Sequence, residues 1–135
     1  MAKFVFFDSR AVKNAVDKGT RKALSRFGAF VRQRAKTSIR KRKRISRPGE
    51  PPSSHTGKLK KNIYFGYDAQ RKSVVVGATQ WSRSGAQSIL EYGGTENRLR
   101  RNQTIRAIYR PRPYMRPAFS KELQNVNKTF TNIVR

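Results

Sequence analysis

Two clusters of basic residues are the side chains of this sequence best suited to chemistry, and the chemistry they suit is anion binding. Six of the eight residues from position 40 to 47 are basic: Arg40, Lys41, Arg42, Lys43, Arg44 and Arg47. A second cluster comprises Arg98, Arg100 and Arg101. Either cluster could hold phosphates, whose contacts make binding salt-dependent, or an acidic protein surface. The alternative for both is a solvated run of charge without a partner.

Catalytic chemistry has little material in this chain. There are 7 Asp and Glu residues, one His and no Cys, so a thiol nucleophile and a metal site built from several His or Cys side chains are excluded. Ser53, Ser54 and Thr56 flank His55 in the sequence, but adjacency in a loop is not triad geometry. We therefore expect a protein that is not an enzyme and that uses no metal, no cofactor and no small-molecule substrate.

The composition describes one very basic domain. The 135 residues carry 32 Lys and Arg, for a formal net charge of +25. Hydrophobic residues make up 36% of the chain and aromatic residues 10%, which is lean for a globular protein but too apolar for a disordered one. We expect a single domain over 1–135 and no membrane association. Because this charge repels itself, an acidic partner, a polyanion or an assembly that supplies counter-charges is expected.

Two segments have the 3.6-residue apolar period of amphipathic helices. The first runs from about residue 11 to 39, is interrupted only at Gly19 and Gly28, and has a basic opposite face. The second follows Pro117, which suits the first position of a last helix. The apolar stripes comprise Val12, Val16, Ala23, Phe27, Phe30 and Val31, and then Phe119, Leu123, Val126, Phe130 and Ile133.

Alternating apolar residues predict antiparallel strands between the two helices. Residues 63–67 and 74–78 alternate on either side of a turn at 68–71, and residues 105–109 suggest a further strand. A short apolar element at 89–92 ends at two glycines. The order predicts an α+β fold, in which an antiparallel sheet of about three to four strands is packed by a long N-terminal helix and a C-terminal helix.

The remaining segments are predicted as connections. Residues 40–56 combine the first basic cluster with three prolines, and we expect an exposed, mobile loop there. Residues 94–104 form a second, arginine-rich loop. Residues 4–7 are β-like, and Asp8 or Ser9 can cap the first helix.

Three segments, in order, resemble one known family. Thr56, Gly57 and Leu59, after a proline pair, resemble the "P…TG.L..SI" segment of the small neck and tail-completion proteins of tailed bacteriophages. The family's "EYG" step is similar to Glu91, Tyr92 and Gly93. Its "ARPFLRPA" segment before the final helix is similar to residues 112–118, with Arg112, Pro113, Arg116 and Pro117 at the matching positions. The "VR..AK" stretch is similar to residues 31–36, and the likeness extends over roughly residues 10–130.

The resemblance implies a structural α+β subunit of the virion that forms a homo-oligomeric ring at the head–tail junction. Such rings are typically six-fold, with twelve-fold symmetry as an alternative, and they join head-side connector or adaptor proteins to the tail tube. DNA passes through the channel of the ring. The implied location is the virion, and the host cytoplasm during assembly. The residues shared with the family have scaffold roles in this interpretation.

Other function classes remain open on the sequence. The net charge alone supports a nucleic-acid-binding protein of ribosomal or nucleoid type, which would bind generic duplex with a steep salt dependence. A nuclease is disfavoured because the chain lacks the acidic metal ligands that such chemistry needs. The dense run at 40–47 and the arginines at 97–106 depart from the phage family's pattern.

Overall fold

The computed structural model describes residues 9–79 and 86–131 of the chain. Its elements, in order, are α1 (Ser9–Ser38), β1 (Arg40–Lys41), β2 (Ser53–Ser54), α2 (Lys58–Lys61), β3 (Ile63–Asp68), β4 (Ser73–Ala78), α3 (Ala86–Tyr92), β5 (Gly94–Arg100), β6 (Gln103–Tyr109), α4 (Met115–Leu123) and α5 (Val126–Thr131). The α+β class, the long N-terminal helix and a C-terminal helix are confirmed. The β-like run at 4–7, Asp8 and Ile133 lie outside the described residues.

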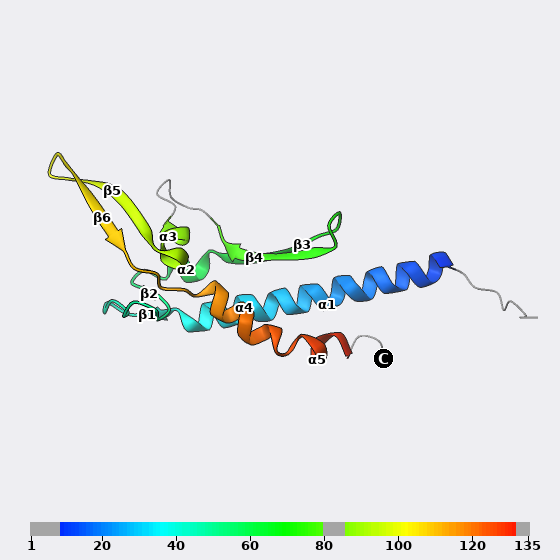
Figure 1. Ribbon diagram of the computed structural model, residues 1–135. Helices are drawn as coiled ribbons and strands as arrows, with labels where there is room; N and C mark the ends of the chain where they lie inside the picture. The colour runs from blue at the N-terminus through cyan, green and yellow to red at the C-terminus, as the bar shows by residue number, and fades with distance from the viewer. Residues whose placement is uncertain (1–8, 80–85, 132–135) are drawn as a thin grey trace, which may run out of the picture.

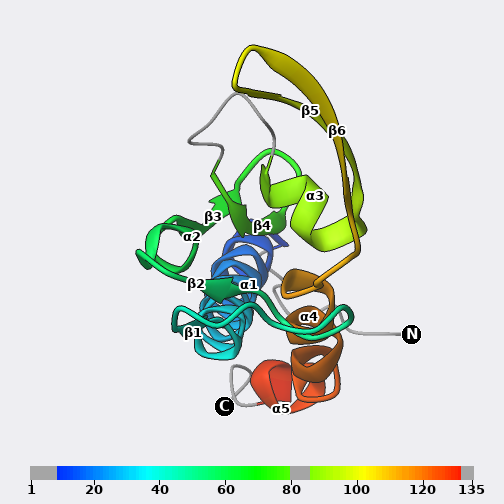
Figure 2. The ribbon, with the colours of Figure 1, turned by 90° about the vertical axis from the view of Figure 1, so that its left-hand side faces the viewer.

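α1 is the central element, and β3, β4, α4 and α5 pack against it. The β3–β4 hairpin lies along one side of it, while α4 and α5 lie along another (Figures 1 and 2). The buried positions of α1 repeat every four residues, which places them on one stripe. They are Ala23, Phe27, Val31, Ala35 and, just past the helix end, Ile39. Val16 and Phe30, which we expected on the core side, are 60% and 47% exposed.

Gly28, predicted as an interruption of the α1 stripe, is the point where the hairpin approaches the helix. A Cβ atom at this position would lie 2.5 Å from Val74 Cγ2 and 3.1 Å from Phe65 Cδ2. Both neighbouring side chains come from the β3–β4 hairpin, whose register pairs Phe65 with Val76. A glycine therefore lets the hairpin pack closely against the helix, at the cost of a lower helix propensity.

In residues 9–79 and 86–131 the strands form three separate two-stranded sheets, where we expected one sheet of three to four strands. β3 pairs with β4 and β5 pairs with β6, both antiparallel, whereas β1 and β2 form a short parallel pair. The extensive contacts of β5 and β6 are with each other. Their hairpin projects away from α1 and does not join β3 and β4 in one sheet (Figures 1 and 2).

Residues 94–104, expected as a loop, form most of this β5–β6 hairpin. Arg101 and Asn102 connect the strands, and both have a positive φ, of 48° and 62°. A two-residue turn of this kind matches the twist of an antiparallel ribbon. The polar composition that we interpreted as a loop is the composition of a ribbon that is exposed on both faces.

The C-terminal helix begins earlier than expected and is divided in two. α4 starts at Met115, so Pro117 is its third residue and not its first. The chain leaves the helical path after Leu123, where the Asn125 amide donates to the Glu122 carbonyl. The buried positions of α4 are Ala118 and Glu122, while Phe119 is 47% exposed.

The apolar core lies where α1, α2, β3 and α4 meet. Its buried members are Phe27, Val31, Ala35, Ile39, Leu59, Ile63, Tyr114 and Ala118, with Val74, Val76, Ala78, Leu90, Met115 and Val126 packed against them. The Phe27 and Phe119 rings meet edge to face, with centroids 5.8 Å apart. Within residues 9–79 and 86–131, no helix has both the length and the apolar character needed to cross a membrane.

Candidate functional site

The first basic cluster begins directly after α1 and is held by main-chain bonds. Arg40 and Lys41 form β1, which pairs in parallel with Ser53 and Ser54 of β2. The Arg42 amide donates to the Ser54 carbonyl at 3.2 Å, and Arg42 Nε donates to Ser53 Oγ at 2.9 Å. Arg42 follows β1 directly, and these two bonds fix its position beside β2.

A tight turn closes the far end of this segment. The Glu50 amide donates to the Arg47 carbonyl at 3.1 Å, and the Glu50 carboxylate accepts the Arg47 N–H at 3.2 Å. Between them Gly49 has a φ of 85°, which favours glycine. The Gly49 amide donates to the carbonyl of Pro111, from a distant part of the chain.

Arg112 attaches the segment to the rest of the fold. Its Nε donates to the Ser46 carbonyl at 3.1 Å, and its amide donates to the Leu90 carbonyl at 2.6 Å. Ser46 is 4% exposed. The segment 40–56, which we expected as an exposed loop, therefore has a buried residue and defined partners. Five of its six basic residues are exposed, and Arg42 is partly buried.

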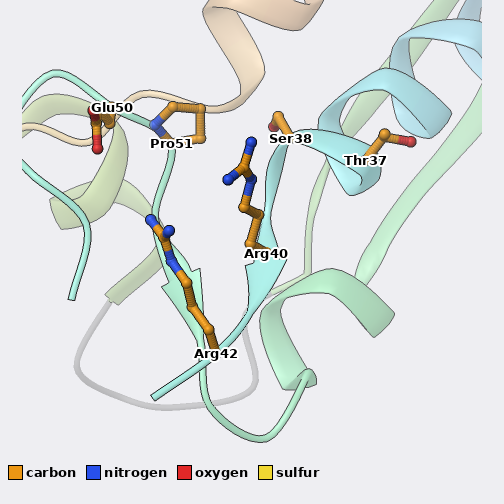
Figure 3. Close-up of a pocket in the computed structure, with 6 residues that line it drawn as sticks. All are labelled: Thr37, Ser38, Arg40, Arg42, Glu50 and Pro51. Atoms are coloured by element: carbon orange, nitrogen blue, oxygen red, sulfur yellow. The ribbon is translucent and has the colours of Figure 1, made fainter. Parts of the chain in front are cut away.

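The arginines of the segment line two adjoining hollows. The first, of about 410 Å³, is lined by Thr37, Ser38, Arg40, Arg42, Glu50 and Pro51. Figure 3 shows that the Arg40 side chain, from β1, and the Arg42 side chain, from just after it, extend toward the side where Pro51 and Glu50 lie. The second hollow, of about 190 Å³, is lined by Arg42, Arg44, Ile45, Arg47 and Glu50. Because the hollows share Arg42 and Glu50, we treat them as one feature and name it the arginine cleft, defined by Arg40, Arg42, Arg44 and Arg47.

The hydroxyl groups that line the cleft already donate hydrogen bonds to main-chain carbonyls of α1. Thr37 Oγ1 donates to the Gln33 carbonyl at 2.8 Å, and Ser38 Oγ donates to the Ala35 carbonyl at 2.7 Å. The arginine side chains are consequently the hydrogen-bond donors that face the cleft. Lys41 and Lys43 are exposed beside it and do not line it.

The second basic cluster lies on the β5–β6 hairpin, away from the arginine cleft (Figures 1 and 2). Arg98 Nε lies 3.2 Å from Glu96 Oε2, and the Arg98 guanidinium lies 5.1 Å from the centre of the Tyr109 ring. Arg100 and Arg101 are exposed near the hairpin turn. The structure does not bring the two predicted clusters together.

The Glu91 and Arg112–Pro117 segments meet at a helix end. Among their contacts, the Glu91 carboxylate accepts the amide N–H groups of Tyr114, Met115 and Arg116 at 2.8–3.0 Å. These are amides of the first turn of α4, which have no partner within the helix, and a negative charge is favourable at that end. Tyr114, at the cap position, makes no side-chain capping bond, so Glu91 from α3 supplies the cap. Burial, and then the Glu91 charge, raise the pKa of Tyr114 to about 12.

The sequence contained a signal for this contact that we did not use. A helix that begins at Met115 with no Ser, Thr, Asp or Asn before it needs an acceptor from elsewhere. The chain has few acidic residues that could accept these amides, and Glu91 is separated from the helix in sequence by one predicted strand region. Its neighbour Tyr92 is 70% exposed, and the Arg116 guanidinium lies 5.9 Å from the centre of that ring.

The other residues singled out by the sequence motifs are also in structural positions. Gly93 ends α3 with a φ of 74°, and its amide donates to the Ile89 carbonyl. Gly57 precedes α2 with a φ of 77° and donates to Ser54 Oγ at 3.0 Å. Leu59 is in the core, at 5% exposure. Thr56 Oγ1 accepts the Lys58 amide, and Pro113 lies partly buried ahead of α4.

The hydrogen bonds of residues 53–56 do not form a catalytic triad with His55. Ser53 and Ser54 accept hydrogen bonds from Arg42 and Gly57 respectively, and His55 is exposed. In the part of the chain that the structure describes, no group of three or more His, Cys, Asp or Glu side chains is arranged to hold a metal ion.

An apolar groove of about 450 Å³ is formed by residues of α1, β4, α3 and α4. It is lined by Phe27, Val31, Val74, Val75, Val76, Glu91, Tyr92, Met115, Arg116 and Phe119. No local sequence pattern predicts this groove, because its walls come from four elements that are distant in the chain.

Comparison of the chain with protein-family models, with curated proteins and with solved structures yields no match.

Proposed function

We propose that this protein is a non-enzymatic structural subunit of a tailed-bacteriophage particle, of the neck or tail-completion type. Copies of the chain assemble as a ring at the head–tail junction, where the ring joins the head-side connector to the tail. The ring is six-fold, with twelve-fold symmetry as the alternative. The assignment to phage particles rests on the ordered motifs at 56–59, 91–93 and 112–118.

The observation that carries the assembly role is the unpartnered β5–β6 hairpin. Its register places Leu99 and Ile108 on one face, because their cross-strand partners are Thr104 and Thr95. These two apolar side chains are 76% and 77% exposed. A two-stranded hairpin is at best marginally stable alone in water. Burial of this face against another copy would stabilise the ribbon.

Further exposed apolar side chains support a subunit that is completed by neighbours. Ile45, Val75 and Tyr92 are each more than 60% exposed, and Val75 and Tyr92 line the apolar groove. The net charge opposes association of identical copies at low ionic strength. We therefore expect assembly to be favoured by salt, which screens the repulsion.

The test is the mass of the purified protein in solution. Light scattering coupled to size-exclusion chromatography, at several protein concentrations and in moderate salt, should give the mass of one defined oligomer, such as six or twelve copies of the chain. Electron microscopy of the same sample should show rings. The L99S/I108S variant should remain a monomer. V16S is the matched control, because Val16 is also an exposed apolar residue but lies on α1.

A second measurement tests the location. Mass spectrometry of purified particles of the phage that encodes this protein should detect the chain. Antibody labelling of these particles should place it at the head–tail junction. A protein that stays monomeric at all concentrations and salt conditions, and that is missing from particles, contradicts the proposal.

A further inference from the structure

The six basic residues of the first cluster have no neutralising partner within the described residues. The ion pairs there join Arg34 to Glu122, Arg71 to Asp68, Lys72 to Asp17 and Arg98 to Glu96. Of the two remaining described acids, Glu91 caps α4 and Glu50 accepts a main-chain N–H. The described carboxylates are therefore already engaged, and the charge of the first cluster is left for another molecule.

The side chains of this cluster also contribute little to holding the fold. Arg40, Arg44 and Arg47 make no side-chain hydrogen bond or ion pair in the described part of the chain, although Arg42 uses Nε to bind Ser53. The segment that carries them is nevertheless fixed, by β1–β2 pairing and by Arg112. A fixed backbone that presents guanidinium groups without other partners into a cleft suits anion binding, because less conformational entropy is lost when the anion binds.

The type of anion follows from charge density and from the donor groups. Duplex nucleic acid carries one negative charge per about 1.7 Å of its axis, so a short length of duplex supplies enough phosphates for all six cations of the cluster. Guanidinium groups form two parallel hydrogen bonds to phosphate oxygens. No aromatic ring is among the described residues that line the cleft, so base stacking is not part of the contact.

We propose that the arginine cleft binds the phosphodiester backbone of nucleic acid, without reading the base sequence. Arg40, Arg42, Arg44 and Arg47 contact the phosphates, and Lys41 and Lys43 add charge beside the cleft. The inference does not depend on ring assembly, because each copy has a complete cleft.

Glu50 opposes this binding and gives a sharp test of it. Its carboxylate is the one negative group among the described residues that line the cleft. A phosphate entering the cleft would be repelled by it, so E50Q should bind nucleic acid severalfold more tightly than the wild-type protein. E50Q keeps every arginine, and its outcome does not require that an arginine variant folds.

The main experiment measures the affinity of the full chain for a short labelled duplex DNA by fluorescence anisotropy, between about 50 and 200 mM salt. R40Q/R44Q/R47Q should reduce the slope of log affinity against log salt by about 2 to 3, since each phosphate contact contributes about 0.9. K18Q/K22Q/R26Q is the control, because it removes the same charge from exposed positions on α1 and should leave the slope within about 1 of wild type.

Two further arms separate the sources of the anion. A duplex RNA of the same length should give a similar slope, because the phosphates are shared. Poly-glutamate of matched charge represents an acidic protein partner and should bind much more weakly. Any of three results would overturn the proposal. They are equal slopes for the two triple variants, an unchanged affinity of E50Q for DNA, and binding of poly-glutamate as tight as that of DNA. Chromatography of the same samples reports ring formation separately.

Discussion

Single side chains connect parts of this protein that are distant in sequence, and Glu91 is the most important of them. Its carboxylate accepts three amides of the α4 N-terminus. A residue that caps a helix from another element fixes the position of both elements. Arg112 has the corresponding role between α3 and the segment of the arginine cleft.

Removal of the Glu91 carboxylate should therefore destabilise the fold. We expect E91A to lower the free energy of unfolding by about 2–4 kcal/mol, because three amides of α4 lose their acceptor. E91Q retains one acceptor oxygen and should cost less. Urea denaturation measures both values, and hydrogen exchange at residues 114–116 reports the cap directly.

The control for Glu91 is E96Q. Glu96 forms an ion pair with Arg98, whose side chain is 62% exposed, and such pairs contribute less than about 1 kcal/mol. If E91A and E96Q had equal effects, the capping role of Glu91 would be refuted.

Tyr114 should make the fold sensitive to alkaline pH. Its pKa is raised to about 12 in the folded protein, by burial first and then by the Glu91 charge, from an ordinary value near 10. Between these values the unfolded chain loses the phenol proton more readily than the folded chain, so stability is intact below pH 10 and falls as the pH rises toward 12. The loss is about 2 to 3 kcal/mol at most.

The measurement is the unfolding midpoint of wild type and Y114F as a function of pH. Lys residues also titrate in this range, and they do so equally in both proteins. The wild-type curve should fall more steeply than the Y114F curve above pH 10. Parallel curves would show that Tyr114 is not the group responsible.

At the scale of elements, the contact between α1 and the β3–β4 hairpin depends on the absence of a side chain at Gly28. In an open helix position, replacing glycine by alanine adds up to about 1 kcal/mol of stability. At Gly28 the new Cβ would lie 2.5 Å from Val74 Cγ2, and valine has few alternative rotamers. We expect G28A to destabilise the protein by about 1–3 kcal/mol.

A double variant distinguishes this clash from other effects of alanine. V74A removes the methyl group that meets the new Cβ, so G28A/V74A should be more stable than the sum of the single effects predicts. Thermal unfolding of the four proteins completes the cycle. A G28A protein that is more stable than wild type would contradict the close packing.

The whole molecule is dominated by its charge. The net charge is +25, and the described carboxylates are all engaged within the chain. Repulsion between the remaining cations opposes the compact state. Residues 9–79 and 86–131 bury only nine apolar side chains, so this electrostatic term is large relative to the stabilisation from the core.

Added salt should consequently stabilise the isolated protein. We expect the thermal unfolding midpoint to rise as sodium chloride increases and to level off when the screening length falls below about 8 Å, near 0.15 M. A rise that continued linearly to molar salt would indicate general salt effects on apolar burial instead of screening. R40Q/R44Q/R47Q should show a smaller rise, because it carries less of the repulsive charge.

Local patterns in the sequence were enough for the elements that depend on neighbouring residues. The period of α1, the β3–β4 hairpin with its turn after Asp68, and strand β6 follow from side chains within a few positions of one another. The basic clusters were equally visible, because charge density is a property of composition. The α+β class followed from the order of these elements.

Only the tertiary structure decided how these pieces meet. Three contacts show this: Glu91 caps α4, the β3–β4 hairpin packs against Gly28, and Arg112 binds the cleft segment. Each joins residues that are 23 to 66 positions apart in the sequence, and a local pattern contains no information on contacts between such residues. The same holds for the charge. The sequence determined that there are 32 basic residues and 7 acids, but the fold decided which cations the acids neutralise. Among the described residues, it left the arginines of the cleft without an ion pair.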